Sequence, residues 1–335
     1  MSALSILNPT LLDLANRMDQ TGTVVKDIVE MLHAQNEIID DMTFIEANSA
    51  FGHKTKVRTG LPTPTWRKLY QGVEPGRSTV AEVTETMGWM EAFSELDCQE
   101  VDMHDNKQAY RMQEDAAHLE GMTQDLATTL FYGNESLTPA KFTGFAPRFN
   151  DPTAENGEQL INGGGSGSDN ASIWLIGWSP TTVTGIVPKG IPAGFKQEDM
   201  GVQLVSQADN SNKKFKAYVS HYKWDVGLCV RDWRYVVRIC NIDKSALTKD
   251  ASAGADLLDL MTQAMEAIQA TTNVRPAFYV PKTVRSFLRR QLVNKVASST
   301  LSMGEVAGKP VVMFDNVPVR RCDALAGDEA AITGF

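Results

Sequence analysis

The sequence has few cysteines, no long apolar run and no excess of positive charge, and each shortage excludes a class of protein. Its four cysteines, Cys98, Cys229, Cys240 and Cys322, lie far apart and form no CxxC pair, so we expect neither a disulfide framework nor a zinc site. No stretch approaches the roughly 20 apolar residues that a membrane-spanning helix needs. The first residues contain no basic run followed by an apolar core, so we expect no signal peptide and synthesis in the cytoplasm.

Length and charge narrow the class further. The chain has 335 residues, of which 42% are hydrophobic and 22% charged, as in a soluble globular protein with a sizeable core. The net charge of −9 argues against tight nonspecific binding to nucleic acid, which needs Lys and Arg to displace phosphate counterions. A like-charged wall that merely encloses DNA is compatible with this charge.

The motifs of common catalytic sites are missing. There is no HExxH, GxSxG or GxGxxG arrangement, and the glycine-rich run Gly163–Ser168 lacks the Gly-Lys-Ser/Thr ending of a phosphate loop. Gly308-Lys309 is followed by Pro310, where such a loop needs Ser or Thr. Adjacent acids such as Asp40 and Asp41 are expected by chance among 41 acidic residues. We therefore expect no catalytic residue, no cofactor and no bound metal.

A long amphipathic helix is predicted over Asp105–Gly133. Asp105 and Gln108 resemble a capping pair, and Gly133 is a typical stop. The helix would be about 40 Å long at roughly 1.5 Å per residue. Its spacing predicts a buried stripe of Ala109, Met112, Ala116, Leu119, Leu126 and Leu130. The predicted wet face carries Lys107, Arg111, Glu114, Asp115 and Glu120.

The residues before this helix change from helical to period-two patterning. Short helices from Asn8 to about Ala47 are too thinly apolar to form a domain and predict an arm packed against something else. Residues 54–93 predict a long two-stranded hairpin with a turn-rich tip at Gln71–Gly76, and Pro62 and Pro64 exclude the first strand from a sheet centre. An edge hairpin of the chain's own sheet is the alternative.

The rest of the chain is predicted to carry a mixed or antiparallel sheet and two more helices. With the long helix and the hairpin, this makes the fold class α+β. The four tryptophans Trp174, Trp178, Trp224 and Trp233 are better candidates for core or interface anchors than for ligand stacking. Predicted strands cover 173–178, 235–239, 276–280, 310–314 and 317–321, and predicted helices cover 255–270 and 284–292. The last helix carries Arg285, Arg289 and Arg290, for which a solvated face competes with contact to DNA or an acidic neighbour.

In this order, the elements resemble the major capsid protein of a tailed bacteriophage, and the short-tailed phages are the most similar. The segments that carry the resemblance are Leu130–Asn134 at the helix exit, Phe142–Phe145 in the following loop, Pro276–Leu288 and Phe314–Ala324. Each motif is weak alone, and their order is more specific.

The resemblance implies a Hong Kong 97-type capsid fold with an N-terminal arm, a long extension-loop hairpin, a spine helix, and peripheral and axial domains. The implied ranges are 1–50 for the arm, 51–101 for the hairpin, 102–134 for the spine helix of the peripheral domain, 135–254 for a largely axial sheet with loops, and 255–335 for the remaining peripheral and axial elements.

The resemblance also implies partners and contact residues. The protein would assemble with copies of itself as hexamers and pentamers into an icosahedral shell around double-stranded DNA, without sequence-specific binding and without a membrane. The hairpin begins too early to leave room for a scaffold segment, so a separate scaffolding protein is expected. The resemblance also implies a portal protein and a decoration or cement protein as partners. The expected location is the virion capsid, after synthesis in the host bacterial cytoplasm. Candidate inter-subunit contacts are Trp66, Arg67, Tyr70 and Glu74 of the hairpin, and candidate inter-capsomer contacts are Arg285, Arg289 and Arg290.

Three alternatives stay open from the sequence. An encapsulin shell protein would share the fold and assemble without a scaffold. A tail or decoration protein would be present in fewer copies per particle. A hydrolase with paired carboxylates would need a deep pocket with convergent acids.

Overall fold

The structure is a computed structural model, and it describes residues 36–49, 52–190, 195–207, 210–248, 254–269, 273–293, 301–306 and 309–335. Most of the predicted arm lies outside these residues. The chain forms two compact units. The described part of the first unit comprises residues 91–122 and 196–223, and the second comprises residues 36–90, 123–195 and 224–335, with the gaps given above.

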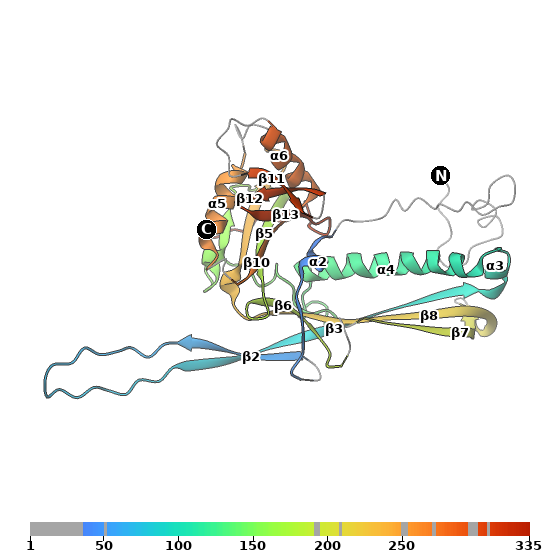
Figure 1. Cartoon of the computed structure of the whole chain (residues 1–335), viewed down its shortest axis with the longest axis horizontal. Helices are drawn as coiled ribbons and strands as arrows, with labels where there is room; N and C mark the ends of the chain where they lie inside the picture. Colours follow the sequence, from blue (N-terminus) through green and yellow to red (C-terminus); the bar gives the residue numbers. More distant parts are fainter. Residues whose placement is uncertain are drawn as a thin grey trace. The chain divides into compact units, whose positions relative to one another are not determined.

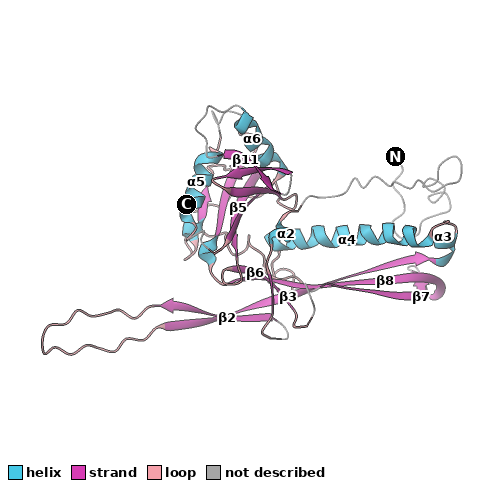
Figure 2. Cartoon of the chain, in the orientation of Figure 1, coloured by secondary structure: helices cyan, strands magenta, loops and turns pink. Residues whose placement is uncertain are grey.

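The chain combines helices with runs of consecutive strands (Figures 1 and 2). The helices are α2 (Ile38–Asp41), α3 (Cys98–Asp102), α4 (Lys107–Tyr132), α5 (Leu257–Ala267) and α6 (Lys282–Val293), with short 3-10 turns at Gly157–Gln159 and Trp233–Tyr235. The strands are β1 (Phe44–Glu46), β2 (Gly52–Gly60), β3 (Thr79–Asp97), β4 (Leu160–Asn162), β5 (Asn170–Trp178), β6 (Val183–Val187), β7 (Phe195–Gln207), β8 (Asn210–Val230), β9 (Val236–Asp243), β10 (Arg275–Val280), β11 (Leu301–Val306), β12 (Lys309–Phe314) and β13 (Val317–Arg321). The predicted strands and helices after residue 170 are therefore confirmed. No helix in the described part of the chain is long and apolar enough to cross a membrane.

A mixed sheet forms the centre of the second unit. Its main path is β11-β12-β13-β10-β5-β6-β8-β3-β2, and β9 pairs with β5 and β4. Strand β5 runs antiparallel to both β10 and β9, and every residue of β5 is buried. A strand covered on both faces needs apolar side chains in both directions, which explains the nearly continuous apolar run from Ile173 to Trp178.

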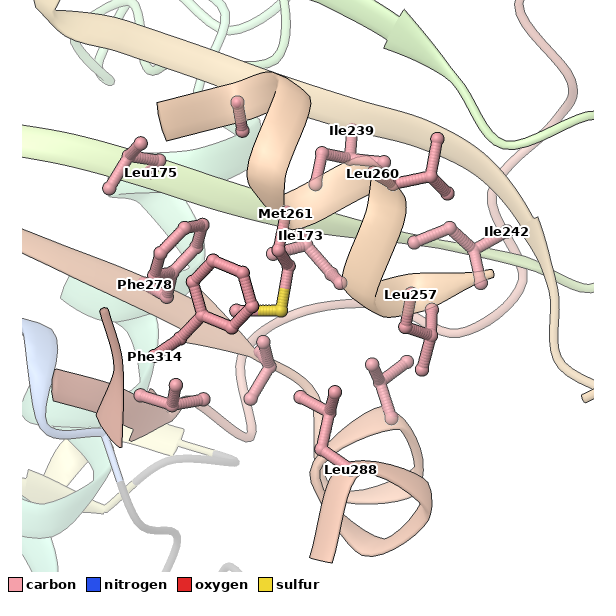
Figure 3. Close-up of a cluster of buried hydrophobic side chains, with 14 of the residues drawn as sticks. Ile173, Leu175, Ile239, Ile242, Leu257, Leu260, Met261, Phe278, Leu288 and Phe314 are labelled. Carbon is pink, nitrogen blue, oxygen red and sulfur yellow. The ribbon is translucent and has the colours of Figure 1, made fainter. Parts of the chain in front are cut away.

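One face of this sheet packs against α5 and α6 (Figure 3). Ile173 and Leu175 point to this side, where Met261 of α5 and Leu288 of α6 cover them. Asp256 caps α5 by accepting hydrogen bonds from the backbone amides of Leu258 and Asp259. The cap fixes the start of α5, and its buried stripe then meets the sheet.

The opposite face packs against the C-terminal part of α4 and the loop that follows it. Trp174, Ile176 and Trp178 point to this side, because neighbouring side chains of a strand alternate between faces. The side chains that cover them are Leu126, Leu130, Phe131, Phe142, Phe145 and Phe149. The expectation that Trp174 and Trp178 are core residues is confirmed, since both are buried.

The predicted hairpin is present as β2 and β3, which pair antiparallel from Gly52 with Thr86 to Gly60 with Thr79. The paired part of β2 ends before Pro62, as expected from the missing amide proton of proline. Residues 61–78 form an extended loop beyond the paired strands (Figure 2).

Helix α4 confirms the long predicted helix but corrects its start. The predicted cap at Asp105 is wrong, because the side-chain oxygen of Asn106 accepts the hydrogen bond from the backbone amide of Ala109 at 3.1 Å. The helix ends at Tyr132, and Gly133 follows it as the predicted stop, with its amide donating to the carbonyl of Thr129 at 2.8 Å.

The predicted buried stripe of α4 is wrong in its N-terminal half. Ala109, Met112 and Ala116 are exposed, Met112 by 65%. Within the first unit, the packed face instead carries Arg111, whose guanidinium lies 4.8 Å from the ring centre of Tyr218 and forms a 2.9 Å ion pair with Asp199. Arg111 was predicted to be wet. Its apolar stem and planar head can cover an aromatic ring, so a charged residue occupies the packed position.

Residues 36–49 are tied to the second unit and correct the helical prediction that ran to Ala47. Phe44–Glu46 form strand β1, which pairs parallel with β6, so this part is not helical. The short helix α2 is held by Arg320, whose guanidinium lies 2.9 Å from Asp41 and 3.3 Å from Glu37.

Candidate assembly surfaces

The tip of the β2–β3 hairpin, residues 61–78, is exposed along its whole length. Trp66 is 99% and Tyr70 104% exposed, and Leu69 beside them is 87% exposed. Arg67 and Glu74, the other two predicted contact residues, are exposed as well. Several large apolar side chains exposed together on one loop are typical of a site that another molecule covers.

The conformation of the tip presents these side chains outward. The amide of Gln71 donates to the carbonyl of Lys68 at 3.2 Å and closes a turn. Within this turn Tyr70 has φ of 65°, a left-handed conformation that is unusual for a bulky residue. Glycine would adopt this φ at lower cost, so the turn conformation does not account for a tyrosine at position 70.

The base of the hairpin holds a buried carboxylate. Glu85 of β3 is only 5% exposed, and both of its oxygens accept hydrogen bonds from the guanidinium of Arg148 at 2.6 Å. Arg148 also donates to the backbone carbonyls of Thr143 and Gly144 in the loop after α4. A planar guanidinium that donates from two nitrogens to one carboxylate fixes both the distance between the two side chains and their relative orientation.

A second polar contact lies on the neighbouring strand. His53 of β2 pairs across the strands with Glu85, and its Nε2 lies 2.7 Å from the guanidinium of Arg231. Arg231 can only donate, so Nε2 of His53 accepts. Burial and the charge of Arg231 lower the pKa of His53, and the charge of Glu85 only partly opposes them.

An open cavity of about 430 Å³ lies beside this hairpin base. Its lining residues are Val83, Glu85, Arg148, Phe149, Ala154, Glu155, Asn156, Val230 and Trp233. Of the charged residues in this wall, Glu85 and Arg148 are already paired with each other, and Glu155 is exposed. The cavity therefore offers space beside the hairpin rather than a set of convergent free acids.

The three predicted arginines of α6 have different surroundings. Arg285 is half-buried and lies 3.5 Å from Glu37, and burial lowers its pKa. Arg289 and Arg290 are exposed, and the guanidinium of Arg290 lies 5.1 Å from the ring centre of Phe287. Arg289 and Arg290 are therefore the members of the trio that a neighbour can reach most directly.

The C-terminal segment is held by Glu329, a residue with a nearly buried side chain that the sequence did not single out. Its carboxylate accepts hydrogen bonds from Arg238 of β9 at 2.9 Å, from Ser172 of β5 and from Tyr132 at the end of α4. Arg238 also donates to the carbonyl of Phe149 at 2.7 Å. Burial, with the nearby charge of Glu329, raises the pKa of Tyr132, so Tyr132 stays a donor.

Comparison with known proteins gives these surfaces their context. A family model described as major capsid protein GP7 matches residues 19–333. The chain belongs to the major capsid protein GP7 family. This GP7-family chain is similar to the solved structure of bacteriophage Epsilon15, with 33% identity, a TM-score of 0.78 and coverage of 100% of both chains.

Two further structures are more distant. The bacteriophage JBD30 capsid aligns with a TM-score of 0.51 and 13% identity over 96% of this chain and 99% of that chain, which supports the fold alone. The SrpI encapsulin of Synechococcus elongatus aligns with a TM-score of 0.48 and 9% identity over 69% of this chain and 95% of that chain, which is too low to carry an argument. No curated protein sequence matches the chain.

The family decides between the alternatives that the sequence left open. The GP7-family chain has the Hong Kong 97-type capsid fold and is a phage major capsid protein that forms the icosahedral shell. It is a structural protein of the virion capsid and not an enzyme. The encapsulin, hydrolase and minor virion protein alternatives are thereby excluded.

Sequence reasoning missed the charged residues at the hairpin base, although one signal was present. Glu85 occupies an apolar-face position in the alternation of Ala81, Val83, Met87 and Trp89. A lone acid on such a face indicates a buried, paired carboxylate. Its partner Arg148 lies 63 residues further along, in a loop without a regular pattern, so the pair itself was not predictable.

Proposed function

We propose that the subunits assemble as hexamers and pentamers around double-stranded DNA, and that the hairpin is an extension loop that contacts a neighbouring subunit. The observation that carries the contact is the exposure of Trp66, Leu69 and Tyr70 at the hairpin tip. Fully burying a large apolar side chain stabilises a contact by about 1.5–3 kcal/mol. Arg67 and Glu74 would contribute polar contacts at the rim, where exposed charges set orientation more than affinity.

The other elements take the roles that the family resemblance implies. We assign residues 1–50 to an N-terminal arm, 51–101 to the extension loop and 102–134 to the spine helix. Residues 135–254 would be largely axial, and residues 255–335 would supply the remaining peripheral and axial elements. Arg289 and Arg290 would contact neighbouring capsomers, whereas the ion pair of Arg285 with Glu37 directs that side chain inward.

Further partners follow from assembly around a packaged genome. A separate scaffolding protein, a portal protein and a decoration or cement protein are proposed on the resemblance alone. The acidic net charge of −9 supports a wall that encloses DNA without gripping it tightly.

The hairpin contact is tested with Trp66→Ala and Tyr70→Ala in the full chain, expressed with its scaffolding protein. We expect folded subunits and at least a tenfold loss of closed shells, measured by sedimentation and electron microscopy, with folding checked by circular dichroism. Thr65→Ala is the matched control, because Thr65 is an exposed neighbour without a large apolar surface. Normal shell yield in both aromatic variants would refute the contact, and unfolded subunits would place these side chains in the core of the hairpin.

A further inference from the structure

The hairpin contact needs more than an apolar tip, because a long two-stranded ribbon must also leave its own subunit in a fixed direction. We propose that Glu85, Arg148, His53 and Arg231 are positioning residues that lock the base of the hairpin, and that acidification opens this lock. The inference rests on the proposed role of the hairpin and names the residues that direct it.

The first half of the lock joins β3 to the loop after α4. The two 2.6 Å hydrogen bonds between Glu85 and Arg148 resist both sliding and tilting, since the pair is planar and bidentate. The next residue, Thr86, donates to Glu135 of the same loop at 2.9 Å. Close packing adds to this, because a side chain at Gly52 would lie 2.2 Å from the carbonyl oxygen of Glu85.

The second half joins β2 to the end of β8. His53 is 6% exposed and accepts the 2.7 Å hydrogen bond from Arg231, which requires the neutral imidazole. A proton on Nε2 would remove the acceptor and place two cations in contact at a buried site. Repulsion between two such charges without solvent is strong enough to separate them.

Among the described residues, the charges that act on His53 are those of Arg231 and Glu85. Glu85 on β3 is the acid opposite it, but its two oxygens are already engaged by Arg148. On β8, the Cys229 thiol lies 3.8 Å from the hydroxyl of Thr55, and burial raises its pKa so that it stays neutral. A protonated His53 would therefore meet the charge of Arg231, which the charge of Glu85 offsets only in part.

The cavity of about 430 Å³ gives the unlocked hairpin somewhere to move. Val83 and Glu85 of β3 line one side of it, and Arg148, Phe149 and Trp233 line the other. In a close-packed interior a broken ion pair is held in place by its neighbours. Open space on this side leaves the bidentate ion pair, together with the pairing of β3 with β2 and β8, to set the angle of the hairpin base.

The direction of the pH effect follows from the lowered pKa of His53. The locked state binds a proton more weakly than the released state, in which the side chain has its ordinary pKa near 6.5. The lock is therefore fully favoured above pH 6.5 and is lost as the pH falls below it. Binding of one proton changes the ratio of subunits with a released hairpin to subunits with a locked hairpin by at most about tenfold per pH unit.

The test is hydrogen–deuterium exchange of the full chain at pH 7.5 and 5.5, corrected for intrinsic rates, together with shell counts by electron microscopy. We expect protection of residues 52–60 and 79–90 to fall by up to about tenfold at pH 5.5. The pH response should be absent in His53→Gln, whose amide oxygen accepts from Arg231 at either pH. His118→Gln is the control, because His118 is an exposed histidine on α4.

A loss of protection that is equal in wild type and His53→Gln would overturn the inference, as would no loss in wild type. Glu85→Gln provides a second route, with exposed Glu82→Gln as its control. We expect the subunit with Glu85→Gln to stay folded and its residues 52–60 and 79–90 to lose protection already at pH 7.5. Unchanged protection of these residues would contradict the lock. Failure of the proposed function gives a different result. The wild-type hairpin would then still lose protection at pH 5.5, but Trp66→Ala and Tyr70→Ala would assemble shells at the normal yield.

Discussion

Replacing Glu329 by Gln tests how the C-terminal segment is held to the centre of the second unit. The side chains of Glu329 and Arg238 are 8% and 6% exposed, so the ion pair is almost completely buried. The substitution keeps the shape and removes one charge. Arg238 is then left as a buried cation without a counter-charge.

The expected loss can be worked out from the contacts that remain. Breaking a buried ion pair by removing one partner costs about 3–5 kcal/mol. Arg238 retains its 2.7 Å hydrogen bond to the carbonyl of Phe149 and its position 5.0 Å from the ring centre of Trp174, and a cation over an aromatic ring keeps about 0.5–2 kcal/mol. We therefore expect the free energy of unfolding to fall by about 3 kcal/mol, at the lower end of the range.

Urea unfolding of the unassembled chain measures this, with tryptophan fluorescence as the signal, since Trp174 and Trp178 lie in the affected core. A slope of about 3 kcal/mol per molar urea converts the loss to a midpoint about 1 M lower. Asp328→Asn is the control, because Asp328 is exposed and its loss should cost less than about 0.5 kcal/mol. Equal midpoints for the two variants would refute the reasoning. The double variant Glu329→Gln with Arg238→Met should recover part of the loss, because it removes the uncompensated charge.

Two further predictions concern the ends of α4. Gly133→Ala should destabilise the chain by about 1–3 kcal/mol, because a Cβ there would lie 2.5 Å from the carbonyl oxygens of Thr129 and Phe142. Gly121→Ala in the same helix should stabilise it by up to about 1 kcal/mol, since no atom lies within 4 Å of the added Cβ, and an opposite order in thermal unfolding would contradict the packing argument. Asn106→Ala should cost about 1 kcal/mol through the lost cap, whereas Asp105→Ala should be nearly neutral. Helix content by circular dichroism near the unfolding midpoint checks the cap, and a larger effect at Asp105 would restore the cap predicted from the sequence.

The sequence predicted best where burial and apolar character coincide. Strand β5 is buried on both faces, so its run from Ile173 to Trp178 is almost wholly apolar and identifies a central strand. The same holds for α5, where Leu257, Met261 and Ala264 keep helical spacing and are all buried. Local pattern and tertiary environment agree in these elements, so the pattern is sufficient.

Prediction failed where a charged residue takes a packed position. On α4, Arg111 packs over Tyr218 while Met112 beside it is exposed, so hydrophobicity points to the wrong face. The position of Arg111 depends on Tyr218 and Asp199, far along the chain, which spacing cannot reveal. The cap shifted by one residue for a different reason, because Asp105 and Asn106 are both good caps and local sequence does not rank them.

The buried charge pairs could not be predicted from local sequence either. They also explain why the structure indicates assembly rather than catalysis. Glu85 with Arg148 and Glu329 with Arg238 join segments 63 and 91 residues apart, and each pair is closed within one unit, so neither offers a free group for chemistry. The exposed apolar side chains Trp66 and Tyr70 have the opposite property, because the folded subunit leaves them in water. A chain that pairs these buried charges internally and leaves aromatic side chains exposed on a projecting hairpin has open contacts at the surface. Such contacts are satisfied by another protein molecule, and in a symmetric shell every copy supplies and receives the same one.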